Sequence, residues 1–82
     1  MPDLELYGTA GCPYTRDMRE WLEWNGRPFV EYDVASDADA RQRMRAFGGG
    51  ARTVPLLVKR GLIVQVGWLG RGCVVSLEDS RS

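Results

Sequence analysis

The chain has 82 residues, of which 44% are hydrophobic and 27% are charged, and its formal net charge is zero. This size and composition predict one small globular domain, and the charge balance gives no broad basic face for nucleic acid or an acidic membrane surface. Its two cysteines are too few for a disulfide framework. Because the chain has no histidine, sites that pair histidine with a serine or cysteine nucleophile are excluded, and a metal site is not expected.

The first two elements follow from the spacing of apolar residues. Residues 3–7 alternate apolar and charged side chains, which predicts a strand. Apolar side chains at spacings of three and four then predict a helix over residues 13–25, and Gly26 is well placed to end it. The stripe expected along this helix consists of Tyr14, Met18, Trp21, Leu22 and Asn25. Trp21 is expected to be buried in it, whereas Trp24 lies off the stripe.

Cys12 stands immediately before this helix. A helix N-terminus carries unpaired N–H groups and a partial positive charge, and both stabilise a thiolate. Pro13 suits the first helical position, where its missing N–H costs nothing. Thr15 stands where a dithiol enzyme would carry its second cysteine, so the motif can attack a disulfide but cannot close one within itself.

A second strand and a second helix are predicted after the first helix. Residues 29–34 are predicted to be a strand, and Ser36 is expected to cap a second helix that runs to about Phe47. The run Gly48–Gly50 is expected to end this helix, because consecutive glycines do not favour helical backbone.

The remaining elements predict a mixed sheet. Residues 54–58 and 62–66 are expected to be two strands joined as an antiparallel hairpin. The first two strands are joined through a helix and should be parallel. The order β-α-β-α-β-β therefore predicts an α/β fold, a mixed four-stranded sheet with helices packed on it. Residues 1–82 are expected to be a single domain with a core over 3–70 and a C-terminal tail over 71–82.

The chain resembles the glutaredoxins in three blocks. These are Leu6–Gly8 followed by Cys12–Arg16, the segment Gly50–Pro55, and the hairpin that ends at Gly67. The resemblance implies a thioredoxin-like fold whose last helix is shortened or missing. A closer likeness is to the Uxx-star subgroup of glutaredoxin-like (seleno)proteins, in which Cys12 would stand where some members carry selenocysteine.

The resemblance also implies roles for individual residues. The implied catalytic residues are Cys12, Pro13, Tyr14 and Thr15, with Cys12 as the nucleophile. The implied substrate-binding residues are Tyr14, Arg16, Thr53, Val54, Pro55 and Trp68. Pro55 would be a cis-proline that faces Cys12, so that the main chain of Val54 pairs with glutathione in the manner of an added strand.

Cys73 has two interpretations. One is a small apolar side chain that fills space beside Val74 and Val75. The other is a resolving thiol that reaches Cys12 and restores the dithiol chemistry that Thr15 removes. The second requires the two Cα atoms to lie within about 7 Å.

These observations favour a glutaredoxin-like thiol–disulfide oxidoreductase that works by a monothiol route through Cys12. Its expected partners are glutathione as co-substrate and disulfide or glutathionylated proteins, with no bound cofactor, nucleic acid or membrane. A cytoplasmic location is expected, and a monomer or weak dimer. Three alternatives stay open: a thiol peroxide reductase, an iron–sulfur carrier, and a redox-inactive binding module with a thioredoxin fold.

Overall fold

The computed structural model of the protein describes residues 2–47 and 52–75. Its elements in chain order are β1 (Leu4–Gly8), α1 (Pro13–Trp24), β2 (Phe29–Asp33), α2 (Ala38–Ala46), β3 (Thr53–Val54), β4 (Leu56–Lys59), β5 (Leu62–Val66) and β6 (Cys73–Val74). Four strands form one sheet in the order β2-β1-β4-β5, and β3 pairs with β6 in a second, two-stranded sheet. The β1–β2 pair is parallel and the β1–β4 and β4–β5 pairs are antiparallel, which confirms the predicted mixed four-stranded sheet.

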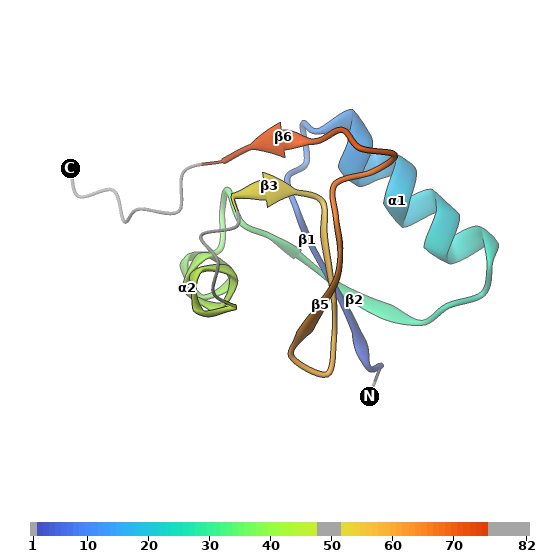
Figure 1. Ribbon diagram of the computed structural model, residues 1–82, viewed down its shortest axis with the longest axis horizontal. Coiled ribbons are helices and arrows are strands. Elements are labelled where there is room, and N and C mark those ends of the chain that lie inside the picture. The colour runs from blue at the N-terminus through green and yellow to red at the C-terminus, as the bar shows by residue number, and fades with distance from the viewer. Residues whose placement is uncertain (1, 48–51, 76–82) are drawn as a thin grey trace.

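The two helices cover opposite faces of the sheet (Figure 1). Successive residues of a strand point to opposite faces, so β1 sends Leu6 toward α1 and Tyr7 toward α2. The cluster on the α1 side contains Leu4, Leu6, Met18, Leu22 and Leu57. The cluster on the α2 side contains Tyr7, Cys12, Val34, Ala40, Met44, Val54, Leu56 and Val58. None of the helices in the described part of the chain is long and apolar enough to cross a membrane.

The buried face of α1 differs from the predicted stripe. Thr15, Met18 and Leu22 are the buried residues of this helix, whereas Trp21 is 42% exposed. The expectation that Trp21 is buried was wrong because positions 15, 18 and 22 face the sheet, which leaves position 21 on the flank of the helix. Its ring packs against that of Trp68, with ring centroids 6.0 Å apart.

Two further element boundaries differ from the sequence prediction. The cap of α2 is Asp37 rather than Ser36, because an Asp37 carboxylate oxygen accepts hydrogen bonds from the amides of residues 39 and 40, at 3.0 and 3.2 Å. The predicted strand 54–58 is divided at Pro55 into β3 and β4, since proline has no N–H to donate to a ladder. The run Gly48–Gly50 lies outside the described residues.

A tight turn after β5 brings the end of the described chain back alongside β3 (Figure 1). The amide of Trp68 donates to the carbonyl of Arg71 at 2.6 Å, and the reverse bond is 2.9 Å long. The two residues between them, Leu69 and Gly70, both have positive φ, at 53° and 78°, as in the two-residue turns of β-hairpins. The segment predicted as a tail therefore contributes β6, and residues 76–82 lie outside the described part.

Leu69 is an unfavourable residue for this turn. A β-carbon is disfavoured in left-handed backbone, and the Leu69 side chain is 81% exposed, so it contributes little burial in return. Leu69→Asn should raise the free energy of unfolding by about 1 kcal/mol and the melting temperature by about 4–8 °C. Thermal unfolding followed by circular dichroism measures this. Asparagine tolerates left-handed backbone better than leucine because its short polar side chain can hydrogen-bond to the nearby main chain. Leu69→Ala has a β-carbon but no side-chain amide and serves as the control. Equal melting temperatures for the two variants would contradict this account of the turn.

Candidate functional site

Cys12 lies at the start of α1, as the sequence predicted. It is the N-cap residue, with extended backbone, and Pro13 follows in the first turn. Its amide donates to the carbonyl of Thr9 and its own carbonyl accepts from the amide of Arg16, each at 3.2 Å. The first turn of α1 contains no acidic residue, so the partial positive charge of the helix end is not neutralised there. This position favours the thiolate form of a reduced Cys12.

The opposite wall of the site comes from β3. The Val54–Pro55 peptide bond is cis, as expected for Pro55. The Cys12 sulfur lies 3.9 Å from the carbonyl oxygen of Val54, and Val54 is fully buried. The structure thus brings together two motifs that are some forty residues apart in the chain.

The sulfur of Cys12 is joined to that of Cys73 by a disulfide bond. The two Cα atoms are 6.2 Å apart, which lies within the usual range for a disulfide, about 4.4–6.8 Å. Of the two interpretations of Cys73 left open by the sequence, the structure supplies the contact that a resolving thiol requires. Cys73 also packs against the cluster on the α2 side, so it is partly a core residue as well.

β6 occupies the edge of β3 at which the main chain of Val54 was predicted to bind substrate. β3 and β6 are antiparallel, with Val54 directly opposite Cys73. One step further along, the amide of Val75 donates to the carbonyl of Arg52 at 2.8 Å. In this state the chain's own strand therefore takes the place beside Val54 where the main chain of glutathione was expected.

Two glycines allow β6 to approach this closely. A β-carbon on Gly72 would stand 2.6 Å from the carbonyl oxygen of Val54 and would also meet the Thr53 side chain, which is too close for any other residue. Before the turn, the amide of Gly67 donates to the carbonyl of Pro55 at 2.7 Å. The hydrogen bond at Gly67 thus fixes the segment before β6, and the missing side chain of Gly72 leaves room for β6 next to β3.

Thr15 is a packing residue in this structure. Its side chain is completely buried and lies against Gly8, where a β-carbon would overlap it. Its hydroxyl has no hydrogen-bond partner among the described residues, so it does not contact the Cys12 sulfur through a hydrogen bond. Thr15 therefore sets how closely the first turn of α1 packs on the end of β1, and through that the position of Cys12.

The other predicted substrate-binding residues lie around the site at different distances from the sulfurs. Tyr14 and Trp68 are half-buried and face a common pocket of about 360 Å³. That pocket is lined by Tyr14, Asp17, Trp68, Leu69 and Arg71. Arg16 is exposed on α1, and its side chain forms no hydrogen bond or ion pair with the described residues.

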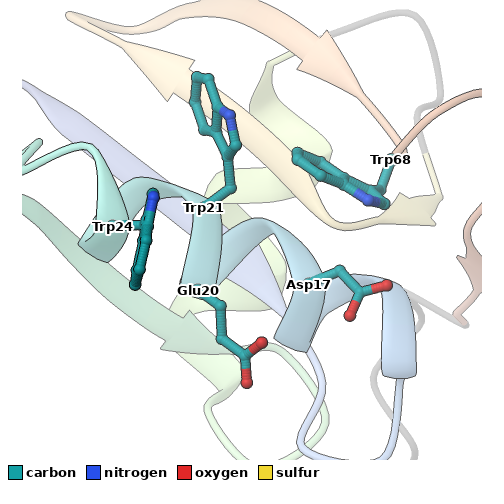
Figure 2. A pocket seen from close by; sticks show the side chains of 5 residues that line it. All are labelled: Asp17, Glu20, Trp21, Trp24 and Trp68. Carbon is teal, nitrogen blue, oxygen red and sulfur yellow. The ribbon is translucent and has the colours of Figure 1, made fainter.

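A second pocket of about 370 Å³ lies next to the first, along the outer face of α1 (Figure 2). It is lined by Asp17, Glu20, Trp21, Trp24 and Trp68. The three tryptophans were not predicted to share one pocket, and its two acidic residues were not predicted at all. The signal was present, because positions 17, 20, 21 and 24 recur at the spacing of one helix face. Neither cysteine lines this pocket, so it is separate from the site at which the two sulfurs react.

Tyr7 brings no negative charge to the cluster that contains Cys12. Burial raises the pKa of Tyr7 well above its ordinary value. Its hydroxyl donates to a Glu5 carboxylate oxygen at 2.8 Å, and that bond and the carboxylate charge raise the pKa further, while Arg43 opposes them. Tyr7 is therefore neutral near pH 7, and its ring stacks on Tyr32 with centroids 5.0 Å apart.

Residues 4–64 match the model of the glutaredoxin family. The chain belongs to this family. A probable glutaredoxin of Synechocystis sp. is 40% identical over 52 residues, which cover 63% of this chain and 48% of that protein. An uncharacterized glutaredoxin-like protein in the rubredoxin operon of Clostridium pasteurianum is 33% identical over 43 residues, or 52% of this chain and 57% of that protein. The chain thus matches about half the length of these relatives.

Solved structures confirm the thioredoxin-like fold of this glutaredoxin-family chain. A crystallised mutant of a thioredoxin-like protein aligns with a TM-score of 0.69 and 30% identity, over 80% of this chain and 83% of that one. A glutaredoxin from Archaeoglobus fulgidus gives 0.68 and 22%, over 83% and 77% of the two chains. A buckwheat glutaredoxin–glutathione complex gives 0.65 and 18%, over 79% and 60%. Thiol–disulfide oxidoreductase is the general class of activity in this family, and membership of the Uxx-star subgroup stays a prediction.

The disulfide should make the stability of the domain depend on redox state. It joins residues 61 positions apart, and in the chain-entropy account a link of that length stabilises the folded state by about 4 kcal/mol at most. A reductant should therefore lower the melting temperature by more than about 8 °C. Cys73→Ser is the control, since reductant should leave its melting temperature unchanged. Equal melting temperatures for oxidised and reduced wild-type protein would contradict the link.

Proposed function

We propose that this chain is a thiol–disulfide oxidoreductase in which Cys12 is the nucleophile and glutathione is the co-substrate. The observation that carries the proposal is the position of the Cys12 sulfur. It lies at the N-terminus of α1, 3.9 Å from the carbonyl oxygen of Val54, and it is bonded to another sulfur. A sulfur held in such a position exchanges one sulfur partner for another, which is the chemistry common to this family.

The proposed reaction begins with the Cys12 thiolate, which the helix end stabilises. The thiolate attacks the glutathione sulfur of a glutathionylated protein, and the protein thiolate leaves and takes up a proton. Cys12 then carries the glutathionyl group as a mixed disulfide. A second glutathione thiolate attacks the glutathionyl sulfur, which releases oxidised glutathione and restores the Cys12 thiolate. This monothiol route needs no resident cofactor or metal and no second cysteine at position 15.

The substrate would lie between α1 and β3. In the proposal, the main chain of Val54 pairs with glutathione after β6 has left that edge, and Thr53 and Pro55 complete this wall. Tyr14 and Trp68 line the neighbouring pocket and would contact the parts of the substrate beyond the sulfur. Arg16, exposed near the start of α1, would attract the carboxylates of glutathione at longer range.

Disulfide or glutathionylated proteins are the proposed partners, and the protein is proposed to act as a monomer or weak dimer. The cytoplasmic location stays a prediction. Two of the three alternatives have direct readouts. Hydrogen peroxide reduced faster than any disulfide would favour the peroxide reductase, and visible absorbance after anaerobic reconstitution with iron and sulfide would favour the cluster carrier.

The test is the rate at which the protein removes glutathione from a glutathionylated peptide in the presence of reduced glutathione. Cys12→Ser should lower the catalysed rate at least about a hundredfold, because the nucleophile is lost. Ser36→Ala, in an exposed loop away from the site, is the matched control and should keep the wild-type rate. Circular dichroism establishes that both variants fold. Wild-type protein that does not exceed the uncatalysed rate would favour the binding module over the oxidoreductase.

A further inference from the structure

We propose that Cys73 is a resolving cysteine, carried on a strand that occupies the substrate's own place at the edge of β3. The inference rests on the proposed function of Cys12 and adds to it a second half-reaction that proceeds without glutathione. The match to the family model ends at residue 64, so this strand lies beyond the part of the chain that the family describes.

The position of Cys73 is that of a substrate cysteine. It lies opposite Val54 in an antiparallel pair, and its sulfur is bonded to Cys12. A peptide that pairs with Val54 while Cys12 attacks its sulfur would have the same two relations to the protein. β6 is therefore an intramolecular counterpart of the disulfide-bonded peptide that Cys12 would attack.

The segment that connects β5 to β6 directs β6 to the edge of β3. The turn at Leu69 and Gly70 reverses the chain, and the bond between the Gly67 amide and the Pro55 carbonyl, 2.7 Å long, fixes where the reversal begins. Gly72 then passes so close to the Val54 carbonyl that no β-carbon fits. These features deliver Cys73 to Cys12 in one register.

β6 is also weakly held apart from the disulfide. It has only two residues, and Val74 is 78% exposed. Cys73 and the adjoining Val75 pack against the cluster on the α2 side but are only partly buried there. Segments with few buried contacts open at low free-energy cost. Once the Cys12–Cys73 bond is reduced, β6 can leave the edge of β3 and a substrate can enter.

The chemistry balances with two electrons. The Cys12 thiolate attacks one sulfur of a substrate disulfide, and the other substrate thiolate leaves. The Cys73 thiolate then attacks the Cys12 sulfur, the Cys12–Cys73 disulfide forms, and the second substrate thiolate leaves and takes up a proton. The substrate disulfide is reduced to two thiols while the two cysteines are oxidised. A thiol reductant, such as two molecules of glutathione oxidised to their disulfide, resets the pair.

The edge of β3 accepts one strand at a time, which couples the two steps. While the substrate pairs with Val54, β6 is displaced and Cys73 is kept away from Cys12. When β6 returns, it removes the substrate's main chain from the edge as its thiol attacks the mixed disulfide. The product is then released in the same step in which the Cys12–Cys73 disulfide forms, because β6 replaces the substrate at the edge of β3.

The first experiment follows the mass of the reduced protein after a pulse of oxidised glutathione, with peptide mapping. Wild-type protein should lose two hydrogens through a Cys12–Cys73 bridge, with a short-lived glutathionyl intermediate on Cys12. Cys73→Ser should retain one glutathionyl group on Cys12, with a lifetime more than about tenfold longer, because intramolecular attack is lost. Gly72→Ala keeps both thiols but obstructs β6, and should also prolong the intermediate. Val74→Ala, at an exposed position of the same strand, is its matched control.

The outcomes separate this inference from the function on which it rests. An equally long-lived glutathionyl group on Cys12 in wild-type protein and Cys73→Ser would overturn the resolving role and leave the proposed function intact. No glutathionyl group and no bridge in any variant would overturn the proposed function itself.

Hydrogen exchange tests the competition for the edge of β3. The Val75 amide, bonded to the Arg52 carbonyl at 2.8 Å, should be protected in the oxidised wild-type protein. It should exchange more than about tenfold faster in the glutathionyl mixed disulfide of Cys73→Ser, because glutathione then takes the edge of β3. Unchanged protection of Val75 in that mixed disulfide would overturn the claim that β6 and the substrate exclude one another.

Discussion

The edge of β3 beside Cys12, which β6 occupies in this structure, is the constraint on which the rest of the site depends. A strand edge offers one row of main-chain donors and acceptors, and one partner satisfies it. Here the partner is β6, with Cys73 opposite Val54. In the proposal, the main-chain groups of β3 that would bind substrate are therefore the same groups that bind β6. Occupation of that edge decides which sulfur lies next to Cys12.

The other half of the site is fixed by how α1 packs on the sheet. Thr15 is buried against Gly8, and farther along the helix Arg19 forms a double hydrogen bond with the Glu31 carboxylate, each at 2.7 Å. These contacts attach α1 to β1 and β2, so the Cys12 end of the helix has little freedom to move. In the proposed exchange the partner that moves is therefore β6. It is held by the Cys12–Cys73 bond, by a two-residue pairing with β3, and by the hydrogen bond between the Val75 amide and the Arg52 carbonyl.

The sequence was sufficient for the parts of the site that rest on local chemistry. Proline favours the first position of a helix, so Pro13 predicts that Cys12 lies at a helix start. The alternation of apolar and polar side chains, with the order of the elements, predicts the four-stranded sheet. It was insufficient for β6, because a strand of two residues has no period, and because Leu69 is a residue that seldom adopts the positive φ of its turn. The burial of Thr15 in place of Trp21 was missed for a related reason, since a polar β-branched residue is not counted in an apolar stripe.

Position 15 of the helix holds threonine, and the cysteine that pairs with Cys12 lies instead on β6. A thiol at position 15 would be fixed on α1, always close to Cys12 and independent of what binds β3. Cys73 is instead on β6, which in the proposal must leave the edge of β3 before substrate binds and must return to it before Cys73 can react. Access to the site and resolution of the intermediate are therefore governed by one movement. In the oxidised protein the disulfide prevents that movement, so β6 can leave the edge of β3 only when a thiol has attacked the Cys12–Cys73 bond and released Cys73 as a thiolate.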